Sequence, residues 1–156
     1  MKSTIRSEYG LPDVLSIKEV PTPIPSNNEV LIRVFATTVN RTDCAILTGK
    51  PFIMRLFTGF FKPKHSITGT DFAGQIESIG KNVTSFKVGD RVMGFDDMGL
   101  KSNAYYMTID ENKPIITIPN NFTYEEAAAS LEGFHYAINF INKVKLKAGQ
   151  KVLVNG

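Results

Sequence analysis

Residues 29–39 read EVLIRVFATTV, and the alternation within this stretch decides the fold class. Val30 and Ile32 fall on one side of an extended chain, whereas Arg33 falls on the other. A period of two is typical of a strand with one packed face and one partly open face. We therefore expect a strand that ends near Thr38 and turns Arg33 toward water.

Similar short runs fill the first two-thirds of the chain on both sides of this stretch. They are rich in β-branched and aromatic residues and are bounded by Gly, Pro and Asn. Further strands are predicted at residues 2–8, 14–20, 67–79, 88–95, 103–109 and 115–118. Pro21, Pro23 and Pro25 favour an extended surface connector. Short strands at this spacing predict a barrel or a sandwich.

Helical signals occur at two places. A short helix is predicted over residues 41–47, and a longer one over residues 124–144. Thr123 and Glu126 form a capping box before the longer helix, in which Gly133 is a point of kinking or division. Its apolar positions recur with helical spacing. They are Ala127, Ala128, Leu131, Phe134, Ile138 and Ile141.

Two segments carry apolar residues that require another element or a ligand to cover them. The last residues, KVLVNG at 151–156, predict a buried strand that stops at a glycine, as at the start of a doubly wound nucleotide-binding fold. The stretch 52–61 holds Phe52, Phe57, Phe60 and Phe61, which require either burial or a ligand. Core packing is the preferred explanation for these four rings.

Composition excludes several classes of protein. The chain has 156 residues, 42% of them hydrophobic, and a net charge of +3 from scattered basic residues, which does not indicate nucleic-acid binding. No stretch is long and apolar enough to span a bilayer, and no GxSxG motif indicates a hydrolase. The one cysteine, Cys44, is expected to be a buried thiol in a reducing cytosol. We expect a cytoplasmic protein without nucleic-acid or membrane partners.

Six blocks, in order, resemble the medium-chain dehydrogenase/reductases, the superfamily of zinc alcohol dehydrogenases, quinone reductases and 2-enoyl reductases. The most characteristic of them is FKVGDRVMGF at residues 86–95. The others are PDVLSIKEVPTPIPSNNEVLIRV, ATTVNRTDCAILTGK, GTDFAGQIESIG, YEEAAASLEGFHYAINFI and LKAGQKVLVNG. GDRV alone is modestly specific, whereas the ordered set is highly specific.

The resemblance implies an α+β chain in two parts. Residues 1–122 would form a GroES-like catalytic domain, a partly open β-barrel, and residues 123–156 the linking helices and first strand of a truncated Rossmann domain. In such proteins a later segment returns to complete the catalytic domain. Its absence here would leave apolar surface uncovered.

The resemblance also predicts that catalytic zinc is absent. Zinc-dependent members place a Cys where this chain has Asn40, and a His-Glu pair where it has Thr70 and Asp71. An amide and a hydroxyl are poor zinc ligands. A second set of residues, Cys44, His65, Asp71 and Glu77, matches no compact metal motif, and His65 is expected in a loop. No metal site is predicted.

Three residues are candidate catalytic groups, namely Asn40, Asp43 and Thr70. Asn40 would donate to the negative charge that develops on the acceptor oxygen, or would cap a turn. Asp43 would orient Asn40 or accept from a cofactor hydroxyl, or would only stabilise a helix start.

The cofactor would also contact Asn40, Glu132, His135 and Gly156. His135 would donate a proton near neutral pH or serve as a packed helix residue. Gly156 would open the glycine-rich turn that holds the pyrophosphate.

The resemblance therefore implies part of an NAD(P)H-dependent oxidoreductase. Its substrate would be a quinone, an enone, an aldehyde or an alcohol. A homodimer is one expected assembly of the parent protein. NADPH is preferred over NADH by analogy. A missing Rossmann domain would bind most of this cofactor, so the 156-residue chain alone would be inactive. The alternatives are a stand-alone GroES-like binding or assembly module and an inactive truncation.

Overall fold

Seven strands and three α-helices make up the described chain, with a short 3₁₀ turn at Pro12–Val14. The structure is a computed structural model that describes residues 1–144 and 146–153. The strands are β1 (Lys2–Ile5), β2 (Ser16–Glu19), β3 (Glu29–Ala36), β4 (Asp71–Ile79), β5 (Arg91–Phe95), β6 (Tyr106–Asp110) and β7 (Ile115–Thr117). The helices are α1 (Arg41–Thr48), α2 (Met54–Thr58) and α3 (Tyr124–Val144).

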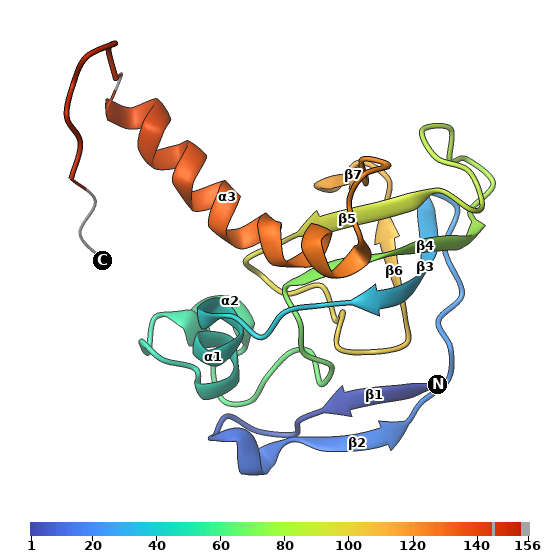
Figure 1. Ribbon diagram of the computed structural model, residues 1–156. Helices are drawn as coiled ribbons and strands as arrows, with labels where there is room; N and C mark the ends of the chain where they lie inside the picture. The colour runs from blue at the N-terminus through green and yellow to red at the C-terminus, as the bar shows by residue number, and fades with distance from the viewer. Residues whose placement is uncertain (145, 154–156) are drawn as a thin grey trace.

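The strands form two antiparallel sheets (Figure 1). The larger sheet has the order β6-β3-β4-β5-β7, and the smaller one is the β1-β2 hairpin. Isolated bridges from Ser3 to Ala104 and from Ile5 to Ile67 join the hairpin to loops of the larger unit. Because β6 and β7 are edges, the larger sheet is not closed in the described residues. The predicted α+β fold with a partly open β architecture is confirmed.

Both faces of the larger sheet are covered. On one face, Ile32 of β3 packs with Phe72 and Ile76 of β4 in the main core. On the other, Ala73 and neighbouring strand residues pack against the first turns of α3. The alternation that predicted β3 holds in part: Val30 and Ile32 are fully buried and Arg33 is exposed, but Leu31, on the same side as Arg33, is also buried.

The approach of β3 to β4 requires a glycine. A Cβ added at Gly74 would lie 2.3 Å from the Arg33 carbonyl oxygen. No side chain fits in that space, so the strands pair closely only because Gly74 has none. The register shifts between Val34 and Ala36, which marks a bulge just before the chain leaves the sheet.

The aromatic segment after α1 differs from expectation. Residues Met54–Thr58 form the short helix α2, and the four rings predicted to pack in the core are mostly exposed. Phe61 keeps 90% of its surface accessible. Core packing was the wrong explanation, because α2 lies beside α1 and outside both sheets (Figure 1).

Helix α3 begins at its predicted capping box. The Thr123 hydroxyl accepts from the Glu126 amide at 3.1 Å, and the Glu126 carboxylate accepts from the Thr123 amide at 2.9 Å. The helix runs without interruption through Gly133, so the predicted division is absent. Figure 1 shows its first turns crossing the sheet and the remainder extending beyond it.

The second half of α3 and the segment after it do not pack as predicted. Ala127 and Ala128 are buried, but Phe134, Ile138 and Ile141 are exposed because the sheet ends beneath them. The described part of the predicted last strand, residues 151–153, forms no strand and is exposed, since no described strand lies beside it. Residues 154–156 lie outside the described residues, and with them Gly156.

No helix within the described ranges is long and apolar enough to cross a membrane.

Candidate active site at the start of helix α1

Asn40 caps α1 and brings the ends of two central strands together. Its side-chain oxygen accepts from the Asp43 amide at 2.9 Å, while the Asp43 carboxylate accepts from the Asn40 amide at 3.1 Å. This reciprocal capping box satisfies amides that a helix start leaves without partners. The capping role predicted as one alternative for Asn40 is therefore confirmed.

The amide nitrogen of Asn40 is also engaged. It donates to the Thr70 hydroxyl at 2.8 Å and to the Asp71 carboxylate at 3.2 Å. Thr70 and Asp71 are fully buried where β4 begins, and Asp71 also accepts from the Thr38 amide at 2.7 Å. The resemblance places Asn40 and Thr70 where zinc-dependent members have metal ligands, and the structure places these two side chains in direct contact.

Two cavities flank the first turn of α1, and its side chains are divided between them. Arg41, Thr42 and Ala45 line the α2 cavity, which measures about 690 Å³ and is completed by residues of α2 and α3. Asp43 and Cys44 line the hairpin cavity, which measures about 710 Å³ and lies between the β1-β2 hairpin and β3. Asn40 lines neither cavity. It influences both indirectly, because it caps the turn of α1 whose side chains line them.

The α2 cavity is apolar with a few polar groups. Met54 and Phe57 of α2 and Tyr136 of α3 form much of its wall. Within it, the Thr42 hydroxyl donates to the Glu132 carboxylate at 2.8 Å, which links α1 to α3 across 90 positions of sequence. A hydroxyl paired with a carboxylate in an apolar cavity is suited to holding or moving a proton at an oxygen of a ligand.

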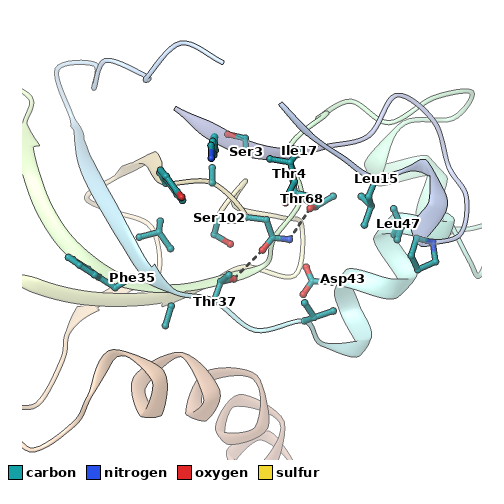
Figure 2. A pocket seen from close by; sticks show the side chains of 18 of the residues that line it. Ser3, Thr4, Leu15, Ile17, Phe35, Thr37, Asp43, Leu47, Thr68 and Ser102 are labelled. Atoms are coloured by element: carbon teal, nitrogen blue, oxygen red, sulfur yellow. Dashed lines mark hydrogen bonds between the residues drawn. The ribbon is translucent and has the colours of Figure 1, made fainter. Parts of the chain in front are cut away.

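The hairpin cavity contains buried oxygens without partners. Figure 2 shows Asp43, Ser3 and Ser102 around it, drawn from α1, β1 and the loop before β6. Asp43 Oδ1 and the hydroxyls of Ser3 and Ser102 make no hydrogen bond with any described group. Burial raises the pKa of Asp43 to about 6, and the charges of Asp71 and Glu132 contribute in the same direction. The Asn40 amide opposes this shift by donating to the carboxylate.

His135 lies apart from this constellation. It is exposed on α3, its ring lies 5.5 Å from that of Phe95, and its Nε2 pairs with the Asn139 amide at 3.1 Å. It lines a separate groove with Phe134 and Ile138. The alternative prediction, that His135 is a packed helix residue, agrees with its ring contacts but not with its exposure. Its predicted proton-donating role stays untested.

Other predictions have mixed outcomes. His65 lies in a loop, as predicted, but Cys44 is exposed rather than buried, because it is on the cavity side of α1. Within residues 1–144 and 146–153, no three His, Cys, Asp or Glu side chains gather as a metal site. Cys44, His65, Asp71 and Glu77 are thus not assembled. Whether zinc is absent from the working protein stays a prediction.

Sequence reasoning missed Arg41, Thr42 and Tyr136. The first two directly follow Asn40, so their position at a helix start was a usable signal. Tyr136 had no such signal, because only the tertiary structure brings α3 beside α2.

The family of alcohol dehydrogenase GroES-like domains matches residues 26–120, which include β3, α1 and β4 to β7. The chain belongs to this family. The GroES-like match confirms the resemblance to medium-chain dehydrogenase/reductases.

Relatives of this GroES-like chain are considerably longer. The quinone oxidoreductase of Sus scrofa is 32% identical over 152 residues, which cover 96% of this chain and 43% of the relative. The solved quinone oxidoreductase of Coxiella burnetii aligns with a TM-score of 0.82 and 26% identity, covering 96% of this chain and 46% of that one. A mycobacterial structure complexed with NADPH aligns with a TM-score of 0.77 and 25% identity, covering 96% and 43%. The chain thus spans less than half the length of these relatives.

Proposed function

We propose that this chain supplies the catalytic-domain part of an NAD(P)H-dependent oxidoreductase that reduces a quinone, an activated alkene or a carbonyl without catalytic zinc. The observation that carries the proposal is the Asn40–Thr70 contact, because an amide and a hydroxyl occupy the positions that the resemblance assigns to metal ligands. The names of the relatives support the reaction class.

NAD(P)H would supply a hydride. Most of the surface that binds this cofactor would belong to a nucleotide-binding domain. In this chain, Arg41 would contribute positive charge at the mouth of the α2 cavity, and Thr42 a hydroxyl. These groups suit an anionic cofactor and an oxygen-bearing acceptor. The predicted contacts of Glu132 and His135 with the cofactor belong to the same proposal.

Thr42 is the group that we assign to the acceptor oxygen. Its hydroxyl donates to Glu132 in the structure, and rotation about its C–O bond would turn that proton toward the cavity. Hydride addition to a carbonyl or quinone leaves negative charge on the oxygen, which the Thr42 proton would neutralise, and water would then return a proton to Thr42.

Asn40 acts by positioning in this proposal. Both of its amide hydrogens are directed at Thr70 and Asp71, so direct donation to an acceptor would break one of these bonds. Thr70 receives one of the bonds, and Asp43 completes the capping box. Together they keep Thr42 turned toward the α2 cavity.

A chimera tests the proposal. Residues 1–156 would replace the matching part of the pig quinone oxidoreductase, and NADPH oxidation would be followed with a soluble quinone. We expect turnover by the chimera and none by the 156-residue chain alone. A folded chimera that binds NADPH but reduces no quinone, enone or aldehyde would contradict the proposal.

Calorimetry separates the domain assignment from the reaction. The 156-residue chain should bind neither NADPH nor NADH tightly, whereas the chimera should bind NADPH. Tight binding by the chain alone would contradict the assignment of the nucleotide site to another domain and would favour a stand-alone binding module.

A further inference from the structure

An exposed apolar surface surrounds α2 and is not used by the proposed reaction. We call it the basic aromatic patch. Its apolar members are Phe52, Ile53, Leu56, Phe60 and Phe61, and its cations are Lys50, Lys62 and Lys64. None of the five apolar side chains lines the α2 cavity, in contrast to Met54 and Phe57.

The patch is ordered rather than loosely attached. Phe60 contacts Phe52 and Phe61 edge to face, with ring centroids 5.6 and 5.0 Å apart. The Arg55 guanidinium also contacts two rings. Its Cζ atom lies 4.6 Å from the centroid of the Tyr9 ring and 5.6 Å from that of the Phe52 ring.

Hydrogen bonds fix the same loop from inside. The Tyr9 hydroxyl donates to the Gly59 carbonyl at 2.6 Å, and the Lys64 amide donates to the Thr58 carbonyl at 2.8 Å. The fold therefore holds this apolar surface toward solvent in a fixed shape, although its exposure is unfavourable.

The charge of the patch has one sign. Between Asp43 and Asp71 the sequence contains four Lys or Arg residues and no Asp or Glu, so this segment alone exceeds the net charge of +3. Neither of the ion pairs found in the described residues involves Lys50, Lys62 or Lys64. These three lysines are exposed, lie within three sequence positions of a phenylalanine of the patch, and are available to negative groups.

We propose that the basic aromatic patch docks the protein on an anionic lipid surface. Phenylalanine side chains would enter the boundary between headgroups and acyl chains, while lysines would contact phosphate and carboxylate headgroups. A protein surface is a weaker fit, because it would have to be acidic and apolar at the same place. The proposal revises the expectation that no membrane is involved, and it concerns association with a surface rather than a span.

The orientation has a consequence for the site. Met54 and Phe57 belong to the same helix as Leu56, so docking through the patch would place the α2 cavity close to the lipid. Lipid binding can be measured without turnover, however, so its test does not depend on the proposed reduction.

Vesicle co-sedimentation tests the proposal with the 156-residue chain and with the chimera. Vesicles of phosphatidylcholine alone would be compared with vesicles that contain about 30% phosphatidylserine. We expect both proteins to sediment with the anionic vesicles only, and expect binding to weaken as salt rises from about 0.1 M to about 0.5 M.

Matched variants locate the contact. Phe61→Ser and the double variant Lys62→Glu with Lys64→Glu should each weaken binding by about tenfold or more. Ile24→Ser removes an apolar side chain that is 89% exposed, against 90% for Phe61, and Lys81→Glu with Lys87→Glu makes the same charge change away from the patch. These controls should leave binding unchanged.

The chain contains no tryptophan, which allows a direct probe of insertion. Emission from Phe61→Trp should shift to the blue on anionic vesicles, whereas emission from Ile24→Trp should not. Equal effects of patch and control variants would overturn the proposal, as would binding by the chain but not the chimera. Loss of a concentration-dependent dimer in the patch variants, without vesicle binding, would assign the patch to a second copy instead.

Discussion

The amide of Asn40 donates to the hydroxyl of Thr70 across 2.8 Å and so joins the turn after β3 to the residue before β4. The same side chain caps α1 through its oxygen. One residue therefore sets the direction of α1 relative to the sheet, and with it the direction of Arg41 and Thr42.

Replacing Asn40 should affect both stability and turnover. Asn40→Ala removes the cap and the bond to the buried Thr70, and should lower the free energy of unfolding by on the order of 2 kcal/mol. In the chimera it should lower kcat by roughly tenfold or more. Urea unfolding and steady-state assays measure the two effects.

Asn40→Ser is the matched variant. It retains an oxygen for the cap but cannot reach Thr70, so it should recover about 1 kcal/mol of the stability while kcat stays low. Full turnover in either variant would show that the turn does not need the Asn40–Thr70 contact.

The Thr42–Glu132 bond should appear as an energetic coupling between α1 and α3. Thr42→Val and Glu132→Gln each weaken a half-buried hydrogen bond to a charged group. A double-mutant cycle on the 156-residue chain should give a coupling of about 0.5–1.5 kcal/mol.

The same two variants separate structure from chemistry. In the chimera, Thr42→Val should lower kcat more than it changes KM, because the hydroxyl acts on charge that develops during reaction. A zero coupling together with an unchanged kcat would remove Thr42 from the site.

The pKa of Asp43 predicts a pH-dependent stability difference. Its folded-state pKa of about 6 is raised from the ordinary 3.8, so the protonated carboxyl stabilises the fold at low pH and this contribution is lost as pH rises toward 6. Asp43→Asn stays neutral throughout. Relative to the wild type, the variant should gain on the order of 1–2 kcal/mol between about pH 4 and pH 7.

Urea unfolding of both proteins across this pH range measures that difference. The comparison cancels other titrating groups such as Asp110 and Glu111, whose pKa values are lowered by local hydrogen bonds. A constant difference from pH 4 to pH 7 would mean that Asp43 is not desolvated.

Two glycines should respond to alanine in opposite ways. At Gly74 the new Cβ meets the Arg33 carbonyl, and the variant should lose about 3 kcal/mol or more through overpacking. At Gly133 an added Cβ meets nothing within 4 Å and the backbone is helical, so the variant should gain about 0.5–1 kcal/mol. Chemical unfolding measures the stability of both variants. A loss of stability in Gly133→Ala would indicate that α3 needs a glycine at this position, as the predicted kink or division requires.

Local patterns predicted the elements well because their causes are local. All seven strands and the α3 capping box follow from alternation, turn residues and side-chain reach. The exposure of Phe60 and Phe61, and of Ile141, was not predictable in this way. An apolar residue is the same in sequence whether or not another element covers it.

The site was only partly predictable for a related reason. Asn40 and Asp43 form a capping box within four residues, so a local pattern contains it. The contacts of Asn40 with Thr70 and of Thr42 with Glu132 connect residues 30 and 90 positions apart. Such pairs depend on how β3, β4 and α3 pack, which the resemblance supplied for Thr70 but not for Thr42.

The end of α3 projects beyond the larger sheet. Contacts with other elements continue as far as Tyr136, whose hydroxyl donates to the Asp97 carboxylate at 3.4 Å. The eight residues after Tyr136 extend about 12 Å at 1.5 Å per residue, so a tilt of about 10° at Tyr136 would move Val144 by roughly 2 Å. Glu132 lies one turn before Tyr136, so a force on the end of the helix would also strain the hydrogen bond between Glu132 and Thr42.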